Sequence, residues 1–166
     1  IDRIQIYVKE KPRTLVSHIG TGRHYNINSK SGRLQILFTD SDQRNNIYNT
    51  DIASYYENME CIEEMHHPYV VITPDYMVYT ADFSKLIERN PVLADITLLY
   101  HAVDNAKDAY LNCNILNLNK QKGVLSIEPN HGNAKNRNIF MDTYIMKREL
   151  FVELIRKAKA ISSAFT

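Results

Sequence analysis

The sequence is poor in the features that mark several common classes of protein. Its two cysteines, Cys61 and Cys113, lack C-x-x-C spacing, which argues against a disulfide framework or a zinc site and favours reduced thiols. No apolar run approaches the roughly 18 residues that a membrane span needs, so we expect neither a span nor a signal peptide. Formal net charge is +1, with no long block of Lys and Arg. We therefore expect a cytoplasmic protein that binds neither nucleic acid nor membranes.

Several catalytic motifs are also missing. There is no G-x-S-x-G or similar nucleophile motif, so covalent catalysis lacks support. Gly20-Thr21-Gly22 lacks both the third glycine of a dinucleotide-binding loop and the Lys-Ser/Thr pair of a P-loop. The six histidines do not have metal-ligand spacing on one helix face. We therefore do not expect the histidines to bind a metal.

The bulk composition is that of a soluble globular domain. The 166 residues are 44% hydrophobic and 23% charged, which suffices for one domain with a sizeable core. The chain begins directly in a strand pattern and ends after an amphipathic helix. We therefore expect residues 1–166 to be a single, partial domain cut from a longer chain.

Hydrophobic periodicity predicts alternating strands and helices. The expected strands cover residues 4–8, 34–38, 69–73, 95–103, 115–118, 124–127 and 139–146. The expected helices cover a segment from Pro12 to Gly20, residues 52–65, residues 83–89 with Asp82 as cap, and residues 150–158. This alternation predicts an α/β fold with a mostly parallel sheet, helices on both faces, and an antiparallel excursion near residues 110–127.

The segment V-V-I-T-P-D-Y at residues 70–76 is the most informative in the chain. It predicts a short buried strand that delivers Asp75 to the loop ahead of the next helix. Ligands of open α/β folds bind at the carboxyl ends of the strands. A carboxylate there can bind Mg²⁺, which shares oxygen ligands with substrate phosphates. The alternative is an ordinary turn or capping aspartate, and the position alone does not decide between them.

Asp40-Ser41-Asp42 is a second candidate, because D-x-D after a strand is the pattern with which many glycosyltransferases hold a metal and a sugar nucleotide. Asp and Ser are also common turn residues. The motif therefore leaves a metal-dependent glycosyltransferase open as an alternative.

Four segments together resemble bacterial glucose-1-phosphate adenylyltransferase, the ADP-glucose pyrophosphorylase of glycogen synthesis. They are I-D-R-I-Q-I-Y-V with K-P-R-T-L-V-S-H-I-G-T-G, the stretch from Tyr48 to Asn58, Y-V-V-I-T-P-D-Y, and M-D-T-Y-I-M-K-R-E-L-F-V-E-L-I. The resemblance implies a Rossmann-like nucleotidyltransferase core. In active members the sugar phosphate attacks the α-phosphorus of ATP, and Mg²⁺ neutralises charge.

The resemblance also implies roles for particular residues. Asp75 takes the place of a metal-binding aspartate, and Tyr48, Thr50 and Asp51 fall in the nucleotide site. The family's Gly-rich loop would precede Ile1, and its second metal-binding aspartate and C-terminal β-helix domain would follow the last residue. Residues 1–166 alone are therefore expected to be inactive.

Departures from the family pattern bear on activity. Thr50 stands in place of a glycine and Ala53 in place of an aspartate. Glu128 replaces the lysine that holds the sugar phosphate, which reverses the local Coulomb interaction. Phe140-Met141-Asp142 replaces Ser-Met-Gly. This pattern resembles the regulatory-type subunit of some Gram-positive bacteria, which implies weak catalysis alone and stimulation of a catalytic partner in a hetero-oligomer. A competent enzyme that uses Lys120, Lys122 or Lys135 instead remains open.

Overall fold

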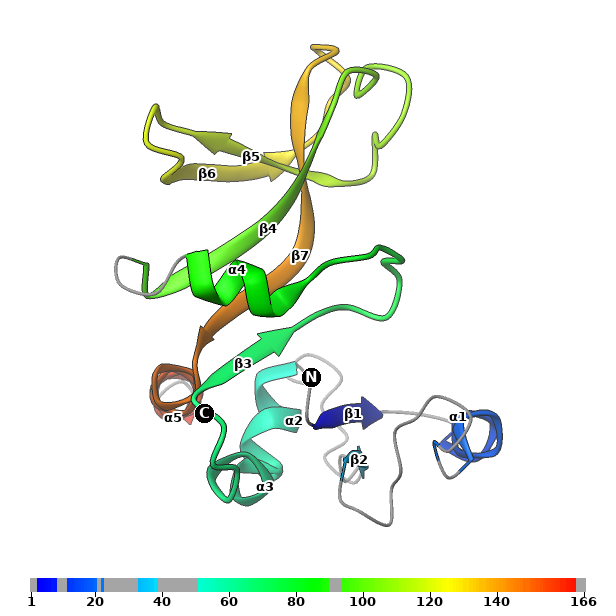
Figure 1. Cartoon of the computed structure of the whole chain (residues 1–166), viewed down its shortest axis with the longest axis vertical. Coiled ribbons are helices and arrows are strands. Elements are labelled where there is room, and N and C mark those ends of the chain that lie inside the picture. The colour runs from blue at the N-terminus through cyan, green and yellow to red at the C-terminus, as the bar shows by residue number, and fades with distance from the viewer. Residues whose placement is uncertain are drawn as a thin grey trace. The chain divides into compact units, whose positions relative to one another are not determined.

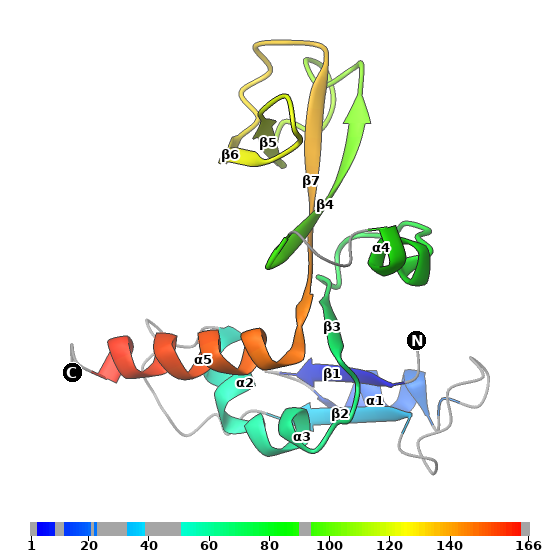
Figure 2. The same cartoon turned by 60° about the vertical axis from the view of Figure 1, so that its left-hand side comes forward.

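The computed structural model describes residues 3–8, 12–20, 22, 33–38, 51–89 and 94–163. They belong to two compact units, Ile1–His67 with Arg148–Thr166, and Pro68–Lys147 (Figures 1 and 2). The elements are, in chain order, β1 (Ile4–Val8), α1 (Pro12–Ile19), β2 (Leu34–Phe38), α2 (Asp51–Glu57), α3 (Met59–Glu63), β3 (Tyr69–Ile72), α4 (Phe83–Arg89), β4 (Ile96–Val103), β5 (Asn114–Leu118), β6 (Val124–Pro129), β7 (Arg137–Lys147) and α5 (Arg148–Ser163).

The first unit contains a parallel strand pair. β1 and β2 pair in register from Ile4 opposite Leu34 onward, and the connection between them contains α1, as a parallel pair requires. The helix begins at Pro12 as predicted, because proline is pre-organised for the first turn. It ends before Gly20, which has φ +56° and donates its amide to the carbonyl of Val16 at 2.8 Å. The predicted strand, helix and strand are confirmed.

Aromatic rings connect the elements of the first unit. The Tyr7 ring of β1 meets Tyr55 of α2 edge-on at 4.9 Å, and Tyr55 meets Phe151 of α5 at 5.2 Å. Such contacts add to the burial of apolar area. Burial raises the pKa of Tyr7, and it raises the pKa of Tyr55 together with the nearby charge of Asp51. Among the described residues of this unit, the buried apolar ones are Val8, Leu34, Met59, Ile62, Phe151, Val152 and Ile155.

The predicted helix over residues 52–65 is two helices, α2 and α3. They are separated by Asn58, whose backbone has φ −106° and ψ 23°. Its side-chain amide donates to the carbonyls of Ser54 at 3.0 Å and Phe38 at 3.4 Å. Asparagine competes in this way with regular helix hydrogen bonds. The apolar face is also narrower than predicted, because Ile52 and Tyr56 are exposed.

The second unit is built on β7, its longest strand among those described (Figures 1 and 2). β7 pairs antiparallel with β3, β4 and β5, and β5 pairs antiparallel with β6. Ile139 of β7 lies opposite Ile115 of β5, and both pack with Ala106 in a buried cluster. Phe140, Ile145 and Met146 are buried along the same strand.

The expectation of a mostly parallel sheet is wrong for the second unit. Residues 144–146 of β7 pair with both β3 and β4, so β7 lies between these two strands and runs opposite to them. β3 and β4 share one direction, as their connection through α4 predicts. They are not neighbours, because the strand inserted between them comes from later in the chain.

The antiparallel excursion predicted near residues 110–127 is confirmed by the β5–β6 hairpin. In its turn Asn119 donates its amide to the carbonyl of Gly123 at 2.9 Å, and Lys122 has φ +62°. Beyond the hairpin the buried Asn130 donates its side-chain amide to the carbonyls of Ala106 at 2.8 Å and Tyr110 at 3.0 Å. The buried side chain of Asn130 thus has its hydrogen-bond partners, and these bonds hold the preceding loop in place.

Helix α4 has the bounds predicted for it. Asp82 precedes the helix and accepts the amide of Lys85 at 3.3 Å, the interaction expected of an N-cap. In the described part of the chain, no helix combines the length and the apolar character that crossing a membrane requires.

Candidate functional site

The end of β3 meets a bulge in β7, and this meeting point is the candidate site. β3 ends at Ile72, opposite Tyr144 of β7 (Figure 2). On the other edge of β7, Leu98 of β4 pairs with Tyr144 and Tyr100 of β4 pairs with Phe140. The single residue between them on β4 therefore lies opposite residues 141–143 of β7. Bulges of this kind redirect side chains and are frequent beside active sites. We call residues 141–143 the β7 bulge.

Asp142 lies at the centre of the β7 bulge in an unusual conformation. Its φ is +45°, a left-handed value that aspartate tolerates better than most residues. Its carboxylate accepts a hydrogen bond from the hydroxyl of Tyr76, in the loop after β3. This hydrogen bond, with lesser contributions from burial and charge, raises the pKa of Tyr76 to about 12. Burial and the Asp142 charge also raise the pKa of Tyr144.

Three hydroxyl groups make a second connection between the loop and the bulge. Thr143 is fully buried, and its Oγ1 lies 2.7 Å from the hydroxyl of Tyr79 and 3.2 Å from Oγ1 of Thr73. The Tyr79 hydroxyl and Thr73 Oγ1 are 3.1 Å apart, and Thr143 is also within 3.0 Å of the carbonyl of Met141. We call Thr73, Tyr79 and Thr143 the hydroxyl triad. The triad connects Thr73 and Tyr79, which lie on either side of Asp75 and Tyr76 in the loop after β3, to Thr143 of β7.

Asp75 sits in this loop between the two connections. Its side chain is exposed, and among the described residues its carboxylate has no hydrogen-bond or ion-pair partner. An accessible carboxylate fits one oxygen position of Mg²⁺, which usually takes one or two protein carboxylates and completes its shell with water and phosphates. In the described part of the chain, no group of three or more His, Cys, Asp or Glu residues could hold a metal by itself. A Mg²⁺ ion held by Asp75 would complete its shell with water or with oxygens of a bound ligand.

The residues predicted for the sugar-phosphate region have different surroundings. Phe140 is 1% exposed and its ring meets Tyr144 edge-on at 5.3 Å, so it belongs to the core of the second unit. Met141 and Asp142 form part of the β7 bulge. Glu128 is exposed on β6 and accepts a hydrogen bond from the side chain of Asn117 at 2.7 Å.

The residues predicted for the nucleotide site are only partly described. Asp51 begins α2 in the first unit, where it is exposed. Tyr48 and Thr50 lie outside the described residues, as do Asp40 and Asp42 of the D-x-D motif. The three lysines considered as substitutes for the missing one are all exposed. They are Lys120 and Lys122 in the β5–β6 turn, and Lys135 before β7.

Sequence reasoning did not find the tyrosines and threonines of this site. Thr73, Tyr76, Tyr79 and Thr143 became apparent only when the fold joined two segments about 70 residues apart in the chain. Hydroxyl side chains directly after a strand are too common to be a signal by themselves. The one local signal was the aspartate in the middle of the last strand, where aspartate is disfavoured.

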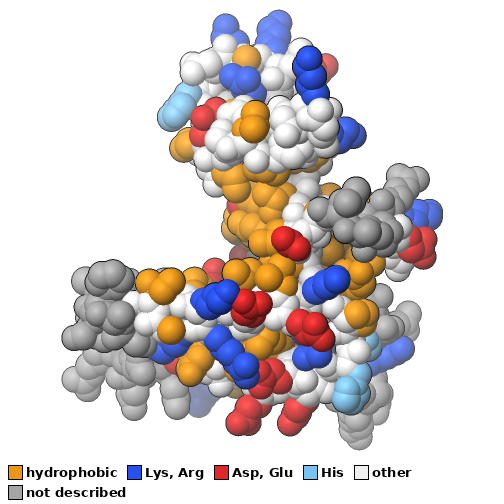
Figure 3. All heavy atoms as spheres, turned by 90° about the vertical axis from the view of Figure 1, so that its left-hand side faces the viewer, with side chains coloured by type: hydrophobic (Ala, Val, Ile, Leu, Met, Phe, Trp, Pro, Cys, Tyr) orange, Lys and Arg blue, Asp and Glu red, His pale blue; other side chains and the backbone are white. Residues whose placement is uncertain are grey.

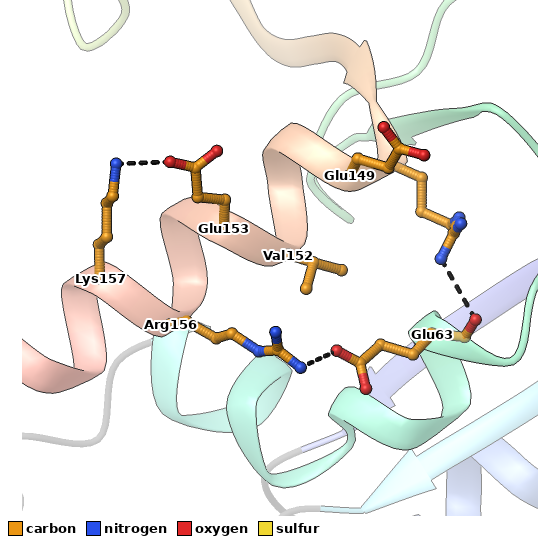
Figure 4. Close-up of a pocket in the computed structure, with 7 residues that line it drawn as sticks. Glu63, Glu149, Val152, Glu153, Arg156 and Lys157 are labelled. Carbon is orange, nitrogen blue, oxygen red and sulfur yellow. Dashed lines mark hydrogen bonds and ion pairs between the residues drawn. The ribbon is translucent and has the colours of Figure 1, made fainter.

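A separate hollow of about 500 Å³ lies in the first unit between α3 and α5 (Figure 4). Most of the charged side chains that line it interact with one another. Arg156 pairs with the Glu63 carboxylate, Lys157 pairs with Glu153, and Arg148 donates to the Glu63 carbonyl at 3.2 Å. Figure 3 shows positive and negative side chains interspersed over this unit. The pairing makes this hollow a weaker candidate for a phosphate site than the β7 bulge.

No protein-family model matches the chain, but individual proteins do. It is 23% identical over 163 residues to the glucose-1-phosphate adenylyltransferase of Clostridioides difficile, covering 96% of this chain and 41% of that protein. The protein of the same name from Clostridium novyi is 25% identical over 162 residues, covering 93% and 41%. The chain thus spans about two fifths of the length of these curated relatives.

Two solved structures share the fold. HddC from Yersinia pseudotuberculosis superposes with a TM-score of 0.65 at 13% identity, covering 90% of this chain and 57% of that one. A protein described as a glucose-1-phosphate thymidylyltransferase from Bacillus anthracis, in complex with a sucrose, gives 0.61 at 14% identity, covering 90% and 54%.

The chain therefore has an α/β fold of the Rossmann-like nucleotidyltransferase type. Within that class, its sequence is similar at 22–28% identity to curated proteins named glucose-1-phosphate adenylyltransferase. The fold class and the resemblance expected from the sequence are confirmed at this level.

Proposed function

We propose that the chain is the nucleotidyltransferase core of a regulatory-type subunit of glucose-1-phosphate adenylyltransferase. It acts in glycogen biosynthesis in the cytoplasm, where it stimulates a catalytic partner in a hetero-oligomer. The similarity to proteins named for the reaction, over more than nine tenths of this chain, supports the reaction class. The reduced activity of this subunit is inferred from its own residues.

The observation that carries this proposal is a pair of carboxylates. The family resemblance places a lysine at position 128 and a glycine at position 142, and this chain has Glu128 and Asp142 there. A phosphate carries negative charge, so a carboxylate in place of the ammonium group at position 128 changes attraction to repulsion, and a carboxylate in place of glycine at position 142 adds a repulsive charge. Both acids lie in the second unit, one exposed on β6 and one in the β7 bulge.

In this proposal the residues that the family resemblance assigns to the nucleotide and its metal are retained in part. Asp75 has the position and the accessible oxygens to hold Mg²⁺, whose role would be to neutralise phosphate charge. Tyr48, Thr50 and Asp51 are the residues that we propose to contact ATP. In this proposal the subunit can bind nucleotide while it holds the sugar phosphate poorly, which suits a regulatory role.

A competent adenylyltransferase is the second candidate, because the similar curated proteins are named for the catalysed reaction. In that case a lysine elsewhere must hold the sugar phosphate. Lys120 and Lys122 belong to the same hairpin as Glu128, and Lys135 precedes β7. Exposed lysines are flexible and can reach a phosphate as point charges.

Binding of glucose 1-phosphate to the full-length protein separates the two candidates. We expect an affinity at least about tenfold weaker than that of a catalytic subunit measured in parallel, for example the Clostridioides difficile protein, because two carboxylates oppose the phosphate. Calorimetry at one ionic strength, with Mg²⁺ present, gives the comparison. Equal affinities would overturn the regulatory assignment and favour the competent enzyme.

A further inference from the structure

We propose that a hollow at the start of β7 binds a small phosphorylated molecule, with the guanidinium of Arg137 as its anchor. The hollow has a volume of about 760 Å³ and lies within the second unit, where the end of β4 pairs with the start of β7 (Figures 1 and 2). None of the residues that line it belongs to the β7 bulge. The inference goes beyond the proposed function and holds whether the subunit is regulatory or catalytic.

Arg137 is the residue that points to a ligand. It lines the hollow and is partly buried, and its Nε atom is enclosed without a hydrogen-bond partner. Among the described residues, no carboxylate forms an ion pair with its guanidinium. The other arginine with such an Nε atom, Arg148, still donates to the Glu63 carbonyl through Nη1. A cation taken partly out of water needs an acceptor, and the oxygens of a ligand can supply it.

The other polar residues of the hollow can complete a phosphate site. They come from β4, from the loop after it and from both sides of Arg137, and they include His101, Asn105, Tyr110, Asn136 and Asn138. The guanidinium fork of arginine binds two oxygens of a phosphate. Amide, imidazole and phenol groups can donate to the remaining oxygens. A carboxylate has two oxygens in all and would leave these donors unused, so the site favours phosphate.

The walls of the hollow are fixed by contacts with the core. Val103 lies opposite Arg137 and packs against the buried cluster around Ile139. Tyr110 has φ +61°, and its carbonyl accepts a hydrogen bond at 3.0 Å from the side chain of the buried Asn130. This backbone is rare for an aromatic residue and persists where surrounding contacts impose it. Walls that are ordered before binding reduce the entropy lost when a ligand enters.

Charge and size also suit a phosphorylated molecule. Asp104 is the acidic residue that lines the hollow, and it is exposed and forms no ion pair with Arg137 among the described contacts. The guanidinium is therefore available to a ligand. Lys and Arg side chains gather over this end of the second unit (Figure 3), which favours the approach of anions. The volume exceeds that of a phosphate group and leaves room for the rest of a small molecule.

Titration of the full-length protein with inorganic phosphate, followed by phosphorus NMR at constant ionic strength without Mg²⁺ or nucleotide, tests the site. Arg137→Gln removes the charge, and Arg137→Lys keeps the charge but loses the fork. Asp104→Asn removes the neighbouring acid. Lys147→Gln is the matched control, because it removes an exposed positive charge from the other end of β7. Acetate is added as a competitor, and circular dichroism and thermal melting show that each variant is folded.

We expect Arg137→Gln to weaken phosphate binding at least about tenfold and Arg137→Lys to weaken it less. Asp104→Asn should strengthen binding about twofold to threefold, Lys147→Gln should change it less than twofold, and acetate should displace little phosphate.

Three results would each overturn the inference. They are an unsubstituted protein that binds no phosphate at millimolar concentration, a folded Arg137→Gln protein with unchanged affinity, and acetate that competes as well as phosphate itself. A fourth is an Asp104→Asn protein that melts several degrees lower, since Asp104 would then be the partner of the guanidinium. None of these results bears on ADP-glucose formation, so this inference and the proposed function fail separately.

Discussion

Replacing Phe140 with alanine is expected to lower the free energy of unfolding of the protein by about 3–5 kcal/mol, the usual cost of removing a buried phenylalanine side chain. Phe140 is 1% exposed, lies opposite Tyr100 of β4 and packs edge-on against Tyr144. The strand that it stabilises continues directly into the β7 bulge. Its loss should therefore disturb the candidate site as well as the core.

Chemical denaturation of the full-length protein measures this effect. Phe140→Leu is the matched control, because it keeps most of the volume and should cost less than about 2 kcal/mol. Tyr76→Phe is a surface control and should change the stability by less than about 1 kcal/mol. The position belongs to a ligand site rather than to the core if Phe140→Ala leaves the stability within 1 kcal/mol while abolishing ligand binding.

Replacing Glu128 with lysine is expected to raise the affinity of the full-length protein for glucose 1-phosphate by tenfold or more. The change turns a repulsive interaction with the phosphate into an attractive one. Glu128 is exposed on β6, where it accepts a hydrogen bond from the side chain of Asn117. The substitution should therefore leave the stability nearly unchanged.

Glu128→Gln is the control for this prediction, since it removes the negative charge and adds no positive one. Its affinity for glucose 1-phosphate should lie between that of the unsubstituted protein and that of the Glu128→Lys protein. Affinity for ATP with Mg²⁺ should be the same in all three proteins. A Glu128→Lys protein that is folded and binds glucose 1-phosphate no better would show that residue 128 does not face the sugar phosphate.

Local structure was predicted well where short-range chemistry decides it. Residues 83–89 form a helix with Asp82 as its cap, and the β5–β6 hairpin lies where the apolar alternation places it. Helix α5 was also found. The sequence predicts that Leu150, Phe151, Leu154, Ile155 and Ala158 form its apolar face, and Phe151 and Ile155 are buried as predicted, whereas Leu154 is exposed and Val152 is buried. The exact face of a helix that is covered depends on the surface against which the helix packs.

The misplaced features depend on contacts between distant residues. Asn58 interrupts the predicted helix by donating to a carbonyl of β2 as well as to its own helix. The position of β7 between β3 and β4 follows from pairing across the whole second unit. Neither effect leaves a periodic trace in the sequence, because periodicity reports which face is buried and not which strand lies beside it.

The candidate site was predicted in part. Asp75 and Asp142 were singled out, the first from its place after a buried strand and the second from a departure from the family pattern. The hydrogen bond between Tyr76, next to Asp75 in the chain, and Asp142 could not be predicted, because the bulge that turns Asp142 toward the loop has no sequence signature. The role of Asp75 as a metal ligand stays a prediction.

The most direct test of the regulatory assignment is ADP-glucose formation from ATP and glucose 1-phosphate with Mg²⁺. The full-length protein is assayed alone and mixed with a catalytic glucose-1-phosphate adenylyltransferase subunit, and the catalytic subunit is assayed alone. Little product from the protein alone, and more from the mixture than from the catalytic subunit by itself, is the predicted result. Product from the protein alone at a rate comparable with that of the catalytic subunit would contradict the regulatory assignment.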